Sequence, residues 1–398
     1  MQLTEITGVK DWLSQFELPD VYLAEHMLKR IRYVNFEEFE AWLQKSVNDV
    51  LKEIERIDGR SAVAIFPVEK PSTHKFNEEK ERKATNDSGG RIAHSLKNIE
   101  RSMPNYVELT PRLESMRAQR VRNIVFVDDF IGTGDRFIKS WRKTVPGSVK
   151  SWCSLGWCKI WLLTFAAHKA GVSNIERNIR AISNSRVRTH VNIPRSFLVE
   201  QKNFRSIILK YSRDLGSARQ RMGYGGLGTP IIFQHGCPNN VPLIFWKSSP
   251  KRSKRPWKAL FPERSIPINL YPFFSTSFIG SSLPEELWLS KNYSLAVQML
   301  ENFTTYSDEQ HQLLLALTWI SKGLPIATIG ANMLISDADL SEIFAKLRNG
   351  GAIDDSGIIT RFGRDILLRM SRPSRNTSRA IEYSSYFPSS FLGFRRET

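Results

Sequence analysis

The stretch NIVFVDDFIGTG, residues 123–134, constrains the fold of this 398-residue chain more than any other segment. Its first part predicts a buried strand over residues 123–127, because buried parallel strands are short and almost continuously apolar. Two carboxylates, Asp128 and Asp129, follow at the predicted strand end, and two glycines then turn the chain into a helix. Such a turn leaves backbone N–H groups and a helix N-terminus available for a phosphate. Acceptors for ribose hydroxyls beside donors for phosphate suit a sugar-phosphate ligand.

The segments around this motif indicate an α/β fold. Further apolar runs predict strands over residues 62–68, 160–167 and 230–233. Helical patterns separate them, over residues 92–103, 107–120 and 204–215. Strands that alternate with helices form a parallel sheet covered on both faces. Residues 4–57 carry apolar side chains at three- and four-residue steps, which predicts a helical layer packed on the following domain; a partner-binding face is the alternative.

The C-terminal third has the pattern of a winged helix. Helical patterns cover residues 284–302, 308–322, 326–334 and 337–349. Ser336 is the predicted N-cap of the last of these, and Gly350-Gly351 is its predicted end. Two apolar pairs then flank a turn at residues 354–357, as in a hairpin, and a closing helix starts near Arg361. We therefore expect four regions: residues 1–58 (helical), 59–265 (α/β), 283–370 (winged helix) and 371–398 (a basic, aromatic tail that orders on a partner).

The charge of the chain predicts a polyanionic partner. Lys and Arg number 57 against 40 Asp and Glu, a formal net charge of +17. Basic residues concentrate at residues 247–264 and in the tail, where they interleave with aromatic rings as in single-strand binders; a solvated basic loop is the alternative. The nucleic-acid-binding candidates in this basic run are Lys251, Arg252, Lys254, Arg255, Trp257 and Lys258.

Acidic residues in the predicted winged helix disfavour a double-stranded partner that is read through its major groove. A winged helix usually reads a major groove with the helix before its wing, here residues 337–349. That helix and the wing turn are rich in acids, which repel phosphates. We therefore expect a single-stranded or structured nucleic acid held by the basic run and the tail, with a protein partner for the winged helix as the alternative.

Cysteine content and terminal sequence predict a cytoplasmic protein. Cys153, Cys158 and Cys237 are too few for a disulfide framework. The N-terminus has neither the basic nor the apolar part of a signal peptide. The longest strongly apolar stretch, residues 160–167, is too short to span a membrane, so no membrane partner is expected.

Four apolar residues, two acids, three variable residues and Thr-Gly resemble the phosphoribosyl pyrophosphate (PRPP) binding motif of type I phosphoribosyltransferases. This resemblance implies a phosphoribosyltransferase-type sheet for residues 59–265. By the same resemblance, Asp128 and Asp129 hold the ribose hydroxyls. It further implies that Gly132, Thr133 and Gly134 bind the 5′-phosphate. Phe130 and Ile131 complete the substrate-binding motif. It also implies Mg²⁺ on the pyrophosphate and displacement at ribose C1, catalysed mainly by positioning and charge stabilisation.

The residues after Thr-Gly depart from that family pattern. Asp135 and Arg136 stand where a small or basic residue and a second Thr are usual. A carboxylate at the lip of a phosphate loop weakens phosphate binding, and Arg136 is the candidate that compensates for it. A degenerate PRPP fold that binds without catalysis is therefore an alternative. An ATPase is disfavoured because no Walker A sequence occurs, and a plain strand–turn–helix unit is the structural alternative.

A second stretch, residues 223–240, extends the candidate site. Tyr224, His235, Asn239 and Asn240 are expected at the rim of a pocket, although Pro-Asn-Asn is commonly only a turn and a single His is commonly structural. The order strand, His, Pro-Asn-Asn, apolar segment and Trp resembles phosphoribosyltransferase-like proteins of bacterial conflict and anti-phage systems, some joined to a winged helix and some linked to retrons.

This second resemblance implies a toxic effector that acts at the ribose C1 of a PRPP-, nucleotide- or NAD-like substrate. Its implied partners are retron DNA or RNA and a reverse transcriptase or another protein. Two alternatives stay open: a non-catalytic module that assembles a nucleoprotein complex, and a nucleotide-sensing winged-helix regulator, which the acidic wing disfavours.

Overall fold

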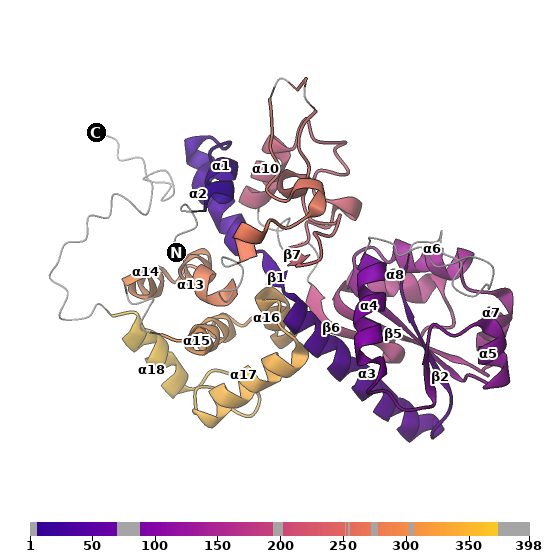
Figure 1. Cartoon of the computed structure of the whole chain (residues 1–398). Coiled ribbons are helices and arrows are strands. Elements are labelled where there is room, and N and C mark those ends of the chain that lie inside the picture. The colour runs from indigo at the N-terminus through magenta and orange to yellow at the C-terminus, as the bar shows by residue number, and fades with distance from the viewer. Residues whose placement is uncertain are drawn as a thin grey trace, which may run out of the picture.

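The computed structural model describes residues 6–69, 88–193, 202–250, 252–253, 255–271, 278–301 and 306–372. Figure 1 shows three groups of elements: a sheet with its covering helices, a group around the N-terminal helices, and a C-terminal helical group. The predicted tail lies outside the described residues except for Ser371 and Arg372.

The central sheet has five parallel strands in the order β3-β2-β4-β5-β6. The strands are β2 Val63–Pro67, β3 Val107–Leu109, β4 Asn123–Ile131, β5 Lys159–His168 and β6 Val187–Ile193. From β2 the chain runs outward to β3 and then returns to the other side of β2 to form β4. Ligands of open parallel sheets bind at the carboxyl ends of the strands beside such a reversal, which here lies between β2 and β4.

Helices cover both faces of this sheet, which confirms the predicted α/β class. Alternate strand residues point to opposite faces: Val63 and Ile65 belong to one apolar core, whereas Ala64 and Phe66 belong to the other. The first core is closed by α3 Phe36–Asp58 and α4 Ser88–Glu100. The second is closed by α5 Leu113–Ala118, α6 Asp135–Lys143, α7 Gly147–Ser154 and α8 Lys169–Asn178.

Three expectations about strands were wrong. Residues 230–233 were expected in the main sheet, but β7 Ile231–Phe233 pairs with β1 Arg32–Val34 in a separate two-stranded sheet. Helix was expected at both β1 and β3, whose three residues are too few to show a strand period. The polar strand β6 was not predicted, because its sequence VRTHVNI lacks a continuous apolar run.

A second group of elements brings the chain ends of the α/β region together. It contains α1 Thr7–Leu13, α2 Leu18–Lys29, α10 Lys202–Tyr211 and α11 Leu243–Trp246. Short 3₁₀ turns at Tyr224–Gly226, Pro262–Arg264 and Ile268–Leu270 complete the connections, and a further one at Asn184–Arg186 leads into β6 of the main sheet. Nε1 of Trp12 donates to the carbonyl of Ile244 at 3.1 Å within this core. The N-terminal helices therefore enter two cores, α3 on the sheet and α1 with α2 on the later segment.

The C-terminal group has the predicted winged-helix order. It contains α13 Phe278–Leu289, α14 Tyr293–Glu301, α15 Asp308–Ser321, α16 Ile326–Met333, α17 Asp337–Asn349 and α18 Arg361–Met370. The side chain of Ser336 caps α17 by accepting from the N–H of Asp339 at 3.1 Å, as predicted. An antiparallel bridge between Ile353 and Ile359 forms the wing.

The winged helix is docked on the α/β region at two places. Ser336 forms an antiparallel bridge with Val191 of β6. Farther away, two ion pairs join the C-terminal end of α2 to α13: Nζ of Lys29 lies 3.0 Å from Glu285, and Nη1 of Arg30, the C-cap residue, lies 2.6 Å from Glu286. At the first of these two places, the N-cap residue of α17 is anchored to the last strand of the sheet.

Two further expectations concern thiols and membranes. Cys153, Cys158 and Cys237 are all free, as predicted. Within the described ranges, no helix combines the length and apolar character needed to cross a membrane.

Candidate functional site

The two acids lie on β4 beside the reversal in strand order. The strand was expected to end before these acids, but β4 continues to Ile131 through further pairing with β5. Asp128 and Asp129 are only 2% and 6% exposed. The N–H of Asp129 donates to Oδ1 of Asp128 at 3.1 Å. Buried carboxylates must be paired or protonated, so their neighbours decide their chemistry.

Two cationic or titratable side chains reach this acid pair from other segments. Nε2 of His235 lies 2.8 Å from Oδ2 of Asp129. Nη1 of Arg136 lies 3.7 Å from Asp128 and 3.9 Å from Asp129, while its Nη2 donates to the carbonyl of Val68 at 2.7 Å. Val68 directly follows β2, so Arg136 links the two strands between which the order reverses. The structure thus brings four predicted site residues together.

The surroundings of the two acids shift their pKa values in opposite directions. Burial, followed by the neighbouring charge of Asp129, raises the pKa of Asp128 well above its ordinary value, and Arg136 offsets this only in part. Burial also acts to raise the pKa of Asp129, but the hydrogen bond and charge of His235, with the charge of Arg136, lower it overall. When the pair holds a single proton, that proton therefore lies on Asp128 and the negative charge lies on Asp129.

The glycine turn after β4 is a close-packed junction. Gly134 has a φ of 80° and caps α6, a conformation that an L side chain rarely adopts. A Cβ at Gly171 of α8 would lie 2.0 Å from the carbonyl oxygen of Gly132. Nδ2 of Asn174, also on α8, donates to the carbonyl of Thr133 at 2.8 Å. The turn is thereby held in shape from α8, which the sequence pattern did not indicate.

The second glycine-rich stretch packs against this turn. A Cβ at Gly225 would lie 2.4 Å from Cγ2 of Thr133, and a Cβ at Gly132 would lie 2.6 Å from the amide of Asn240. Nδ2 of Asn240 donates to the carbonyl of Tyr224 at 2.8 Å. The hydroxyl of Tyr224 donates to Oδ2 of Asp135 at 2.9 Å. The carboxylate that departs from the family pattern is thus bound by the second stretch.

Three predicted site residues lie away from the acid pair's polar groups. Phe130 is buried, with its ring centroid 5.8 Å from that of His168. Ile131 is part of the core closed by α6 and α8. Asn239 is exposed, and its backbone carbonyl accepts from the N–H of Tyr224 at 2.8 Å. Phe130 and Ile131 thus pack into the cores on opposite faces of the sheet, whereas Asn239 holds the second stretch through its backbone.

The basic run requires one correction. Trp257 was expected to stack on bases, but it is 7% exposed and its Nε1 donates to the carbonyl of Ile244 at 2.9 Å. Its ring packs on Phe16 with centroids 5.1 Å apart. Arg252, Arg255 and Lys258 are exposed, and Lys251 and Lys254 lie outside the described residues. Although charged residues surround it in the sequence, Trp257 is buried because the N-terminal segment, distant in sequence, covers it.

The recognition helix α17 offers little positive charge. Lys346 forms ion pairs with Glu309 and Glu342, and Arg348 lies 3.8 Å from Asp355 of the wing turn. Asp337 and Asp339 at its start are exposed. Both basic side chains of the helix thus face acids of the same domain, which is unfavourable for reading a phosphate-lined groove.

Two family models identify the chain as a phosphoribosyltransferase-like protein with a winged helix. A family model described as PRTase-CE matches residues 9–263, and one described as wHTH-PRTase associated matches residues 314–393. The first match spans more than half of the chain, so the protein belongs to the PRTase-CE family. Neither the curated proteins nor the solved structures compared with the chain give a match.

Proposed function

We propose that the α/β domain acts at ribose C1 of a PRPP-, nucleotide- or NAD-like substrate. The observation that carries the proposal is the convergence of Asp128, Asp129, Arg136 and His235 at the reversal in strand order. Substrates of open parallel sheets bind at this place. A carboxylate, a carboxylic acid, a guanidinium and an imidazole offer acceptors for ribose hydroxyls beside a cation for phosphate oxygens.

Each member has a proposed role that follows from its surroundings. Asp129, held ionised by His235, accepts from a ribose hydroxyl, and protonated Asp128 both donates and accepts. The side chain of Arg136 is 33% exposed, compared with 3% for Asp128, so it is the member best placed to meet an incoming phosphate. A negative charge on Asp129 also stabilises positive charge that develops on the ribose ring when the bond at C1 breaks.

Magnesium fits this site as an ion carried by the substrate. Mg²⁺ is usually bound by one or two carboxylates together with substrate phosphates. Within the described parts of the chain, no group of three or more His, Cys, Asp or Glu residues is arranged to hold a metal. Asp129, the member of the pair that stays ionised, is the carboxylate that would contact the ion, and the ion would neutralise charge on a pyrophosphate leaving group.

The biological role that we propose is a cytoplasmic effector of an anti-phage system of the retron type. Support comes from the resemblance of the segment around His235 and from the winged helix that accompanies it. Control by a nucleic acid, a reverse transcriptase or another protein would pass through the winged helix, because Ser336 and Glu286 join it to the α/β region.

Incubation of the purified chain with PRPP, NAD or nucleotides, with and without Mg²⁺, tests the proposed activity. Substrate loss and release of the base are followed by chromatography. Asp128→Asn with Asp129→Asn should reduce turnover by about 100-fold or more, because both the proton donor and the charge are removed. Asp11→Asn, an exposed acid on α1, is the matched control. The proposal is overturned if the double variant keeps full turnover or toxicity while removal of residues 371–398 abolishes it.

A binding module without turnover is the second candidate, and Asp135 favours it. Its carboxylate accepts from Tyr224 beside the turn where a 5′-phosphate is expected. Calorimetric titration distinguishes the two candidates: a module binds a nucleotide or PRPP that is recovered unchanged. In that case, Asp135→Asn should strengthen phosphate binding, because a like charge is removed.

A further inference from the structure

A pocket lies at the edge of the sheet opposite the acid pair, where the strands begin. Its volume is about 330 Å³, at the lower end of the range of small-molecule sites. Arg122 lines it and directly precedes β4, whereas Asp128 lies six residues farther along that strand. At about 3.3 Å per residue, the pocket and the acid pair are about 20 Å apart. The pocket is therefore separate from the site already described.

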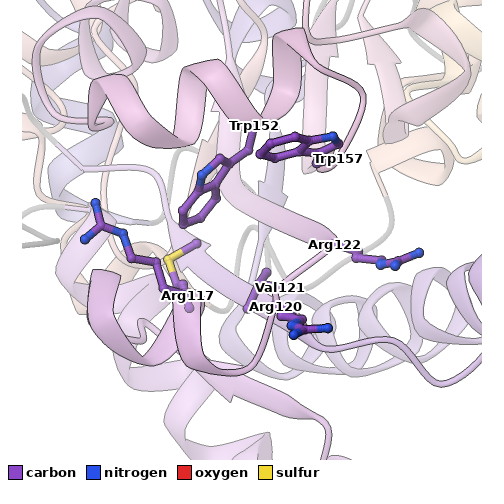
Figure 2. Close-up of a pocket in the computed structure, with 7 residues that line it drawn as sticks. Arg117, Arg120, Val121, Arg122, Trp152 and Trp157 are labelled. Carbon is purple, nitrogen blue, oxygen red and sulfur yellow. The ribbon is translucent and has the colours of Figure 1, made fainter.

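Two indole rings form one side of this pocket. Figure 2 shows Trp152 and Trp157 on its upper side, below α7 and the turn that follows. Trp157 is 65% exposed, which is unusual for so large an apolar side chain. Its backbone N–H donates to the backbone carbonyl of Trp152 at 2.9 Å, and this bond holds the two residues in a tight turn. Both indoles line the pocket from this turn.

Three guanidinium groups lie along the other side. Figure 2 shows Arg117 beside Trp152 at the left, and Arg120 and Arg122 below Trp157 toward the right. All three are exposed, and none forms an ion pair within the described ranges of the chain. No acidic residue lines the pocket. The nearby carboxylate of Asp58 is bound by Lys159 and Asn123.

Arg120 adds a conformational observation. It follows α5 with a φ of 52°, in the left-handed region where glycine is usual after a helix. A long cationic side chain is thus placed at the pocket by a backbone conformation that is unfavourable for it. The floor is apolar, formed by Met116 and Val121.

We propose that this pocket binds a nucleotide, with its base against the indole of Trp157 and its phosphate on the arginines. Aromatic faces take bases of any sequence, and guanidinium groups take phosphate. Three exposed positive charges match an anion, with that of Arg122 also acting on the carboxylate of Asp58. The indoles add a preference for an anion that carries a flat ring. The nucleotide comes either free or as one unit of a single strand. The pocket does not depend on turnover at Asp128, so the two proposals can fail separately.

Fluorescence anisotropy of labelled oligothymidylate with the full chain tests the pocket. Trp157→Ala should weaken binding about tenfold or more, the range found for loss of one base stack. Arg117→Ala with Arg122→Ala should also weaken it and should lower the slope of log affinity against log salt by about 0.7 per lost phosphate contact. Ultraviolet cross-linking should attach the oligonucleotide to the peptide that contains Trp157, and this readout separates the pocket from binding by the tail.

Controls and competitors decide the outcome. Leu155→Ala removes an equally exposed apolar side chain from the same turn, and Arg101→Ala removes one exposed positive charge elsewhere; both should bind as the wild type does. Displacement by AMP identifies a free nucleotide as the ligand, and binding of the oligonucleotide without such displacement identifies a strand. The proposal would be overturned if all variants bound equally, if cross-links formed only elsewhere, or if neither the oligonucleotide nor AMP bound. It would also be overturned if polyglutamate binding were weakened by the same substitutions. Circular dichroism melting verifies that Trp157→Ala is folded.

Discussion

Nε2 of His235 lies 2.8 Å from Oδ2 of Asp129, although 106 positions separate them in the chain. The contact is buried, with the two side chains 5% and 8% exposed. It joins the second glycine-rich stretch to β4, so the two motifs recognised separately in the sequence form one site. A charge on Asp129 that is held in this way is the basis of the first prediction.

Replacing the two acids one at a time should move stability in opposite directions. Asp128→Asn removes a carboxyl whose ionisation burial opposes, so the free energy of unfolding at neutral pH should rise by about 1 kcal/mol, or about 2–4 °C in Tm. Asp129→Asn takes the charged partner from buried His235, so the free energy should fall by about 1–3 kcal/mol. Thermal melting of both variants measures these shifts.

The pH dependence gives the sign of each effect. Because the pKa of Asp128 is raised, this carboxyl contributes stability below its unfolded pKa of about 4, and that contribution is lost as pH rises. The increase in the free energy of unfolding caused by Asp128→Asn should therefore grow above that pH. The lowered pKa of Asp129 contributes stability above that value and is lost in acid, so the loss from Asp129→Asn should shrink as pH falls. Shifts of the same sign for both variants would contradict the assigned proton distribution.

Two neighbouring glycines offer a matched test of the contact between the two stretches. Gly225 and Gly226 have φ values of 71° and 66°, but only at Gly225 would a Cβ meet Thr133. Gly226→Ala should therefore cost only the left-handed backbone, about 1–2 kcal/mol. Gly225→Ala should cost more and should also weaken nucleotide or PRPP binding, because the methyl group pushes against Thr133. Equal effects in denaturant unfolding and calorimetry would show that the contact is not maintained in solution.

The ion pair between Arg30 and Glu286 should hold the winged helix in place. Burial lowers the pKa of Arg30 to about 10 and raises that of Glu286, so each group depends on the other. Arg30→Met leaves a buried carboxylate and should cost about 3–5 kcal/mol, whereas adding Glu286→Met should recover most of that loss. Lys346→Ala, which breaks two exposed ion pairs, should change stability little. Denaturant unfolding and limited proteolysis follow the docking, and a double variant no better than Arg30→Met would argue against the pairing.

Trp257 and Lys258 are adjacent in the sequence, but Trp257 is expected to affect stability and Lys258 to affect oligonucleotide binding. Trp257→Ala empties a buried site beside Trp12 and Phe16 and should lower the free energy of unfolding by about 3–5 kcal/mol. Lys258→Ala, at an exposed position, should leave the melting temperature unchanged and weaken oligonucleotide binding if the basic run contacts phosphates. Unchanged stability of Trp257→Ala would contradict the packing described for this core.

Long apolar runs and caps made much of the fold predictable from the sequence. The strands around residues 63–67, 123–127 and 159–168 show strong local patterns, and Ser336 with Asp339 gives a capping signal. Strands of three residues, such as β1 and β3, have no such pattern and depend on neighbours that are remote in the chain. Trp257 shows the same limit, because the residues that bury it lie at the other end of the α/β region.

The site was predictable where chemistry is local. Two adjacent acids before a glycine turn identified Asp128 and Asp129, and a polar cluster after a strand identified His235 and Asn240. Asn174 was missed because it lies within an amphipathic helix, where an amide carries no distinctive signal, although it donates to Thr133. The pairing of Tyr224 with Asp135 likewise depends on the fold of the second stretch.

The bridge between Ser336 and Val191 has a consequence for self-association. A parallel sheet of five strands has two outer strands, here β3 and β6, whose unpaired backbone groups can template strands of another molecule. At β6 the start of α17 shields part of this exposed backbone. At β3 the outer strand is only three residues long, too short to serve as a good template. The winged helix thereby covers part of the longer of the two edges, and its release would expose that backbone.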